Sequence, residues 1–225
     1  KKDFSFLLNI ILFGLISLIL LSQPDFGMFI LFFCVWILQL LNSNLEKKII
    51  FPILGLFFLT FILSYFFIDH VRFRIDNFLF PNIGDNYQIT KSLESFANGG
   101  LFGQGIGNGT VSKNLPDAHS DFIYALIGEE FGFITAFSIL IFYIIIYIRI
   151  YFVSKITKNL FILNSLTGLG NILIFQTIIN ISSSLNLLPT KGMTLPFISY
   201  GGSSIISSSL VVGFILTLIK NAKNQ

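Results

Sequence analysis

Six long apolar runs constrain this chain more than any other feature of its sequence. The runs are Phe4–Ser22, Phe26–Leu41, Ile49–Ile68, Phe122–Tyr147, Phe161–Ile181 and Leu195–Ile219. A helix of roughly 17 to 25 apolar residues crosses the ~30 Å hydrocarbon core of a bilayer. Only 11% of the 225 residues are charged and 54% are hydrophobic, whereas a soluble domain is roughly 25% charged. The sequence therefore predicts an all-α, polytopic membrane helical bundle with six spans.

One connection between these runs is long. Residues 69–121 separate the third run from the fourth and hold most of the acidic residues, while the other connections are short. We interpret residues 1–225 as a single membrane domain that contains this large loop. The chain begins with Lys1 and shows no signal peptide, so we expect further membrane spans before it.

Lysine and arginine residues are distributed unevenly between the two sides of the predicted bundle. One side holds nine of them: Lys1, Lys2, Lys47, Lys48, Arg149, Lys155, Lys158, Lys220 and Lys223. The other side holds five: Arg72, Arg74, Lys91, Lys113 and Lys191. Basic residues favour the cytoplasmic side of a membrane, which predicts that both termini are cytoplasmic and that residues 69–121 are extracytoplasmic. The net charge of +3 then reflects topology, and we expect no nucleic-acid partner.

Two classes of cofactor site are disfavoured by the residues present. Cys34 is the only cysteine and there are two histidines, which argues against a zinc site. The glycine-rich stretch NGGLFGQGIGNGT, residues 98–110, has neither the G-x-G-x-x-G spacing nor the lysine of a nucleotide-binding loop. This stretch is either a flexible loop or a place where backbone N–H groups approach a phosphate closely.

Several polar residues stand at or inside the predicted spans. Asp25 is expected to cap the second span. The stretch LPDAHSDFIYALIGEEFGFI carries four carboxylates, on Asp117, Asp121, Glu129 and Glu130. Ionisable residues at membrane depth usually face a bundle interior or a wet cavity, and helical periodicity places Glu129 closer than Glu130 to the direction of Asp121. We therefore expect Glu129 to share the partners of Asp121.

Two further features remain open to two interpretations each. The cations on the loop side are either separately solvated or together hold a pyrophosphate. Residues 188–209 bring prolines, paired glycines and serines into the last span. Small residues there allow close helix packing, whereas prolines and glycines can break a helix that lines a cavity.

Four stretches in order resemble one family. They are QPDFG, GDNYQITKSLESFANGGLFGQGIGNGT, LPDAHSDFIYALIGEEFGF and LPTKGMTLPFISYGGSS, and the resemblance runs from Phe4 to Lys220. The chain is similar to the SEDS family (shape, elongation, division and sporulation), which includes FtsW, RodA and SpoVE. The IGEE and LPTKG segments look more like division-type FtsW than elongation-type RodA. Ser120 and Met193 stand where relatives often have threonine and leucine.

The resemblance implies a fold and an activity. Family members have ten spans, so the six runs would be the fifth to tenth, in a protein of the bacterial cytoplasmic membrane. They polymerise lipid II, the undecaprenyl-pyrophosphate-linked disaccharide-pentapeptide, into glycan strands. A class B penicillin-binding protein, which is the division transpeptidase, and other divisome proteins are the implied partners, besides membrane lipid.

The resemblance also places functional residues. The family's essential carboxylate falls on Asp121 and its loop glutamine on Gln88. Asp121 would act as a base or as a ligand of a divalent cation, Mg²⁺ or Mn²⁺, and the sequence leaves both open. We expect substrate contacts from Arg72, Arg74, Gln88, Lys91, His119, Glu129, Lys191, Ser199, Tyr200 and Ser203. A flippase for the lipid-linked precursor and a non-catalytic scaffold for the transpeptidase remain the alternative functions.

Overall fold

The structure of the chain is a computed structural model, and the regular secondary structure of the residues that it describes is helical. These are residues 2–23, 25–42, 47–80, 86–189 and 192–223. The helices are α1 (Lys2–Ser22), α2 (Phe26–Asn42), α3 (Lys47–Phe67), α4 (Asp69–Leu79), α5 (Tyr87–Gly99), the 3₁₀ turn η1 (Ser112–Asn114), α6 (Ile123–Ile156), α7 (Leu160–Ser184) and α8 (Gly202–Lys223). The predicted all-α class is confirmed.

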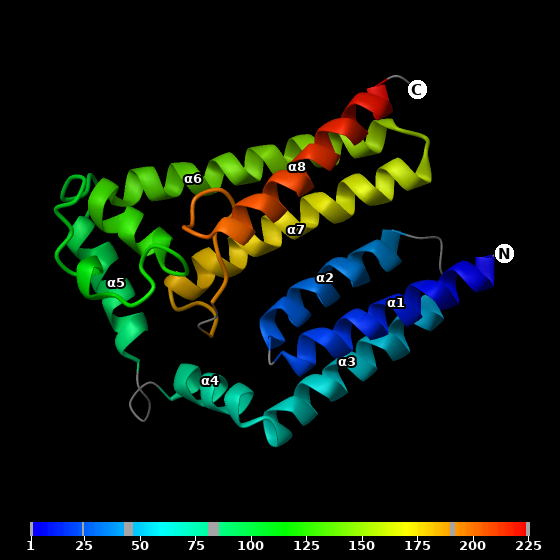
Figure 1. Cartoon of the computed structure of the whole chain (residues 1–225), viewed down its shortest axis with the longest axis horizontal. Coiled ribbons are helices and arrows are strands. Elements are labelled where there is room, and N and C mark those ends of the chain that lie inside the picture. The colour runs from blue at the N-terminus through cyan, green and yellow to red at the C-terminus, as the bar shows by residue number, and fades with distance from the viewer. Residues whose placement is uncertain (1, 24, 43–46, 81–85, 190–191, 224–225) are drawn as a thin grey trace.

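The helices form two groups that meet along α7 (Figure 1). Helices α6, α7 and α8 lie side by side in one group, α1, α2 and α3 form the other, and α2 packs on α7. Half of the apolar window of α7 is buried, against 11% for α6 and for α8. Helix α7 is therefore the centre of the bundle, and the other two turn most of their apolar surface outward, as lipid-facing helices do.

The two ends of the bundle differ. Both termini lie at one end, and α4, α5 and the segments around them lie at the other, which we call the loop end (Figure 1). This arrangement agrees with the prediction that both termini share one side of the membrane and that residues 69–121 occupy the other.

The first three helices pack through aromatic rings. Phe13 stacks on Trp36 with ring centroids 3.9 Å apart, and Phe33 stacks on Phe57 at 3.5 Å. The indole N–H of Trp36 also donates a hydrogen bond of 2.6 Å to the side chain of Asn9. Because lipid removes the hydrophobic drive for helices to associate, such close packing and polar contacts hold them together.

The predicted large loop is folded. Helix α4 leaves α3 at an angle of 91°. Helix α5 packs on α6 so closely that a side chain at Gly99 would collide with the backbone of Gly128. The Ser92 hydroxyl, on the buried face of α5, donates to the carbonyl of Ser184 in α7 over 2.6 Å. The described parts of residues 69–121, together with the first part of α6 up to residue 131 on which α5 packs, thus form a helical cap fixed to the bundle.

Helix α6 is broken near the loop end. Gly132 has φ 82° and ψ 173°, and a Cβ there would collide with the backbone of residues 101–103. The backbone groups that the break releases are satisfied by the glycine-rich stretch. Gln104 and Gly105 donate to the carbonyls of residues 129 and 130, and the amides of residues 133 and 134 donate to the carbonyls of Gly100 and Leu101.

The break changes the predicted fourth span. The predicted span Phe122–Tyr147 coincides with α6, which begins at Ile123, breaks at Gly132 and continues to Ile156. The part after the break, residues 133–156, is about 36 Å long at 1.5 Å per residue and can cross a bilayer by itself. The carboxylates that precede the break belong to the helical cap.

The last predicted span also starts later than expected. Helix α8 begins at Gly202, so residues 195–201 of the predicted span are outside the helix. Pro196 and Phe197, which has φ 63°, lie in a turn whose Tyr143–Pro196 hydrogen bond ties it to α6. The interpretation that proline and glycine break a helix here is confirmed.

The membrane-crossing capacity of the described helices falls into three grades. Helices α6, α7 and α8 are long and apolar enough to cross a bilayer, and α3 together with α4 passes as one bent pair. The described parts of α1 and α2, Leu8–Ser22 and Gly27–Asn42, are shorter apolar helices. Every predicted span coincides with a helix, and the protein is a multi-pass membrane protein. The count of six crossings stays a prediction for the two shorter helices.

Candidate functional site

Asp121 lies at the loop end in the turn that leads into α6. Its backbone amide donates to the carbonyl of Asp117 over 3.0 Å, so residues 117–122 form a compact turn. Its side chain is partly buried and faces Gly192, where a Cβ would lie 2.8 Å from Oδ2. A residue with any side chain at position 192 would displace the carboxylate, so glycine at this position leaves room for it.

The surroundings of Asp121 shift the pKa of its carboxyl group in opposite directions. Burial, followed by the negative charge of Asp117, raises the pKa of the Asp121 carboxyl, and the positive charge of Arg74 on α4 lowers it. A raised pKa makes a carboxylate a stronger proton acceptor while it is ionised, as general bases require.

The turn that carries Asp121 is held in place by the helix core. Asn180, fully buried in α7, donates to the backbone carbonyls of Asp121 (2.8 Å) and Met193 (2.6 Å). Ser199 accepts from the amide of Leu195 (2.7 Å) and donates to the carbonyl of Ser120 (2.5 Å). These bonds join the residues before α6 to the turn before α8.

His119 and Tyr200 lie next to each other and line the same cavity. The amide of Tyr200 donates to the carbonyl of His119 over 2.8 Å. Both residues line an open cavity of about 620 Å³ together with Ser112, Lys113 and Glu130, among others. We call this the first cavity, and its volume is in the range of small-molecule binding sites. His119 and Tyr200 were both predicted as substrate contacts, and their placement is compatible with that role.

A second cavity of about 330 Å³ is lined by Gly192 and by residues of α7 and α8. Gly192, which faces the Asp121 carboxylate, is one of its lining residues. Its polar lining comes from Gln176 on α7, Thr194, and the serines at positions 203, 204, 207 and 208 of α8. Ser203 was predicted as a substrate contact and lies here, whereas Ser199 is 2% exposed and acts on the site through the turn that it holds.

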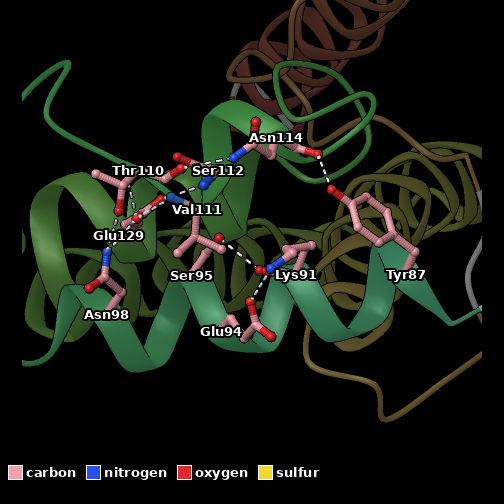
Figure 2. A network of polar contacts seen from close by, with 10 residues as sticks. All are labelled: Tyr87, Lys91, Glu94, Ser95, Asn98, Thr110, Val111, Ser112, Asn114 and Glu129. Atoms are coloured by element: carbon pink, nitrogen blue, oxygen red, sulfur yellow. Dashed lines mark hydrogen bonds and ion pairs between the residues drawn. The ribbon is translucent and has the colours of Figure 1, made fainter.

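Glu129 lies in a different environment from Asp121 (Figure 2). It is fully buried. Its Oε1 accepts hydrogen bonds from the Asn98 side chain (2.6 Å) and the amides of Thr110 (3.0 Å) and Val111 (2.9 Å), and its Oε2 accepts one from the Ser112 amide (2.7 Å).

This arrangement corrects two expectations. The expectation that Glu129 shares the partners of Asp121 is wrong, because the hydrogen bonds of Glu129 come from Asn98 near the end of α5 and from the amides of residues 110–112. The flexible-loop interpretation of the glycine-rich stretch is wrong too. Backbone N–H groups do converge on an anion there, but the anion is the protein's own carboxylate.

The loop-side cations do not form one cluster. The positive charge of Arg74 lowers the pKa of Asp121, and Lys113 lines the first cavity. Arg72 is paired with Asp76 on its own helix at 3.5 Å, and Lys91 with Glu94 on α5 at 2.5 Å.

Two further residues were predicted as substrate contacts. Gln88 is partly buried in the first turn of α5. Lys191 lies outside the described residues.

A divalent cation would depend mainly on Asp121 and its substrate. Within the described residues, no group of three or more histidine, cysteine, aspartate or glutamate side chains could hold a metal ion. Mg²⁺ is often bound by one or two carboxylates and substrate phosphates, so this donor set does not amount to a complete metal site.

Asn180 is the main site residue that sequence reasoning missed. The available signal was an amide side chain in the middle of an apolar run, since polar residues inside a membrane are expensive and usually functional. Which backbone carbonyls it would bind depends on two turns that are distant in sequence.

Taken together, the fold and the site define a polytopic helical membrane protein in which one partly buried carboxylate, on Asp121, directly follows residues that line one cavity and faces a glycine that lines a second. The family model for cell cycle proteins of the FtsW, RodA and SpoVE type matches residues 1–224. The chain belongs to this family.

Curated relatives share the name "Probable peptidoglycan glycosyltransferase FtsW". The relative from Caulobacter vibrioides is 36% identical over 202 residues, which cover 90% of this chain and 52% of the relative. The relative from Coxiella burnetii is 37% identical over 236 residues, which cover 100% of this chain and 62% of the relative. The chain therefore spans about half to three fifths of the length of these relatives.

A solved structure has the same fold. It concerns the structural coordination of polymerization and crosslinking by a peptidoglycan synthase complex. One of its chains matches with a TM-score of 0.75 at 22% identity, covering 98% of this chain and 63% of that chain. This match supports the arrangement of helices described above.

Proposed function

We propose that this protein is a peptidoglycan glycosyltransferase that polymerises lipid II into glycan strands during cell division. The observation that carries the proposal is the position of Asp121, which is partly buried, directly follows residues that line the first cavity and faces Gly192 of the second cavity. The curated names of the FtsW relatives support the same activity.

The chemistry of the substrate suits a site with one carboxylate. The donor sugar of lipid II carries a pyrophosphate leaving group, which departs as a stable anion, so no protonating acid is needed as it is in glycosidases. One base remains necessary to take the proton of the attacking sugar hydroxyl. Asp121 takes that role, and its pKa, raised by burial and Asp117, suits it.

The remaining groups bind and orient. Arg74, near Asp121, offsets negative charge that develops on the departing pyrophosphate. His119 and Tyr200 in the first cavity, and Ser203 in the second, contact the sugars of the donor and acceptor substrates. A bound divalent cation would supply further charge at the pyrophosphate.

A flippase for the lipid-linked precursor is the second candidate. The observation that favours it is the polar lining of the second cavity, which continues along α8 from Ser203 to Ser208. The two functions are separated by giving the purified full-length protein labelled lipid II in vesicles. A polymerase produces glycan strands that can be sized on a gel, whereas a flippase moves lipid II across the bilayer and produces no strands.

The expected partners and location follow from the same proposal. We expect a class B penicillin-binding protein and other divisome proteins to bind this protein in the bacterial cytoplasmic membrane, with its loop end outside. Single cysteines replacing Asn98 and Lys155, in a Cys34→Ala background, test the orientation in intact cells. An impermeant thiol reagent should label position 98 and spare position 155, and the reverse pattern would overturn the orientation.

A further inference from the structure

Three successive backbone amides at the loop end converge on one buried carboxylate. The amides of Thr110, Val111 and Ser112 all donate to Glu129 over 2.7 to 3.0 Å. We propose that Glu129 is a positioning residue that fixes the wall of the first cavity and thereby sets the affinity of the site for lipid II. The inference rests on the proposed function and extends it to a residue that takes no part in the chemistry.

The hydrogen bonds leave Glu129 no free capacity for substrate. Oε1 accepts three bonds and Oε2 accepts one from Ser112, and the side chain is fully buried. Consecutive N–H groups in such a turn form a concave anion site. Here the chain fills the site with its own carboxylate, and Gly109 keeps the approach open, because a Cβ on it would lie 3.0 Å from Oε2.

One of the three amides that Glu129 holds belongs to a residue that lines the first cavity. Ser112 donates to Glu129 through its amide (Figure 2). Ser112 and its neighbour Lys113 also line the cavity. The turn η1 then leads through Leu115 to the segment that carries Asp117 and Asp121. A change at Glu129 therefore reaches the substrate site through residues 110–115.

A second set of bonds makes the effect local. Residues 100–105 are tied to the break in α6 by backbone hydrogen bonds, which do not use the Glu129 side chain. Loss of the carboxylate should release residues 110–112 and leave this backbone tie and the helices in place.

The test uses purified full-length protein and two measurements for each variant. The first is hydrogen exchange at the amides of residues 110–112, and the second is the KM and kcat of lipid II polymerisation. Glu129→Ala removes the carboxylate with one methylene, and added acetate has the atoms to refill the space. Glu129→Gln keeps the volume and replaces one acceptor oxygen by a donor.

Both variants should show faster exchange at residues 110–112 and a KM about 10- to 100-fold higher. That range follows from a cost of ~1–3 kcal/mol for leaving buried donors unpaired, which lowers the fraction of binding-competent protein. The kcat should change much less, because bound substrate restores the wall. Acetate should lower the KM of Glu129→Ala, and neutral acetamide should not.

Asp25→Asn is the matched control. Asp25 caps α2 by accepting from the amide of Met28 over 3.2 Å, and asparagine caps helices equally well. The variant removes one carboxylate from a helix end far from residues 110–112 in sequence, and both measurements should remain at wild-type values.

Three results would overturn the inference: unchanged exchange at residues 110–112 in both variants, faster exchange with unchanged KM, or a lower kcat with unchanged KM. If Glu129→Ala fails to fold, Glu129→Gln carries the same test through its exchange and KM. If wild-type protein makes no glycan, the proposed function fails, and the exchange data still decide whether Glu129 holds residues 110–112.

Discussion

Two neighbouring regions of the loop end use carboxylates in opposite ways. Residues 98–114 close around Glu129, which is fully buried and accepts four hydrogen bonds. Residues 115–122 carry Asp121, which is partly buried and whose carboxylate faces Gly192. The first carboxylate is saturated by the protein, and the second is left with capacity for a ligand.

The difference shows how the four carboxylates of one stretch should be interpreted. Depth along a helix, which the sequence suggests, does not separate them, because α6 breaks at Gly132 and both residues belong to the cap. The number of donors already supplied by the protein does separate them. We therefore expect the reaction to depend on Asp121 and the shape of the site to depend on Glu129.

The largest effect is expected from Asp121→Asn. The asparagine keeps the shape of the side chain and cannot accept a proton, so glycan synthesis should fall by about 10²- to 10⁴-fold. Strand lengths and yields from labelled lipid II, measured with the full-length protein and its transpeptidase, check this. Near-normal synthesis would remove the catalytic role from Asp121 and with it the contrast between the two regions.

Gly192→Ala should have an intermediate effect. The new Cβ would lie 2.8 Å from Oδ2 of Asp121, and displacing a catalytic group by about 1 Å can cost up to about 10²-fold in rate. Gly213→Ala, on α8 where a Cβ meets nothing within 4 Å, is the control. Equal kcat/KM values for the two variants would show that the Asp121 side chain has room to move.

Asn180→Leu should remove the hydrogen bonds by which α7 holds the backbone of Asp121. Its amide group bonds the carbonyls of Asp121 and Met193, and leaving these unpaired costs about 1–3 kcal/mol. We expect a lower kcat and a lower midpoint of thermal unfolding. Thr177→Val is the control, since its hydroxyl bonds only the carbonyl of Leu173 in its own helix among the described contacts. A wild-type kcat for Asn180→Leu would mean that the turn holds Asp121 without α7.

The sequence predicted the helices well and the site in part. Apolar runs locate membrane helices because lipid leaves few alternatives, and the family motif points to Asp121. The break at Gly132 was missed because a glycine alone does not specify a positive φ, and here the backbone of residues 100–105 stabilises it. The roles of Glu129, Ser199 and Asn180 depend on hydrogen bonds between segments far apart in sequence, which residue spacing does not encode.

The smallest effect, a shift in the pH dependence, is expected from the charges around Asp121. Its pKa is raised by burial and by Asp117 and lowered by Arg74. If ionised Asp121 is the base, kcat/KM should rise with pH through this pKa. Asp117→Asn should then move the acidic limb of the profile to lower pH, and Arg74→Gln should move it to higher pH.

Protein stability provides an independent check with its own sign. A carboxyl group whose pKa is raised on folding binds its proton more tightly in the folded state, so stability falls as pH rises through the window above the unfolded pKa. Asp121→Asn removes this loss. Above that window the variant should therefore unfold at the same or a higher temperature than wild type, although its activity is lost.

The pH profile of kcat/KM has its own contrary outcome. An acidic limb that moves in the same direction for Asp117→Asn and Arg74→Gln would contradict the assignment of the limb to Asp121.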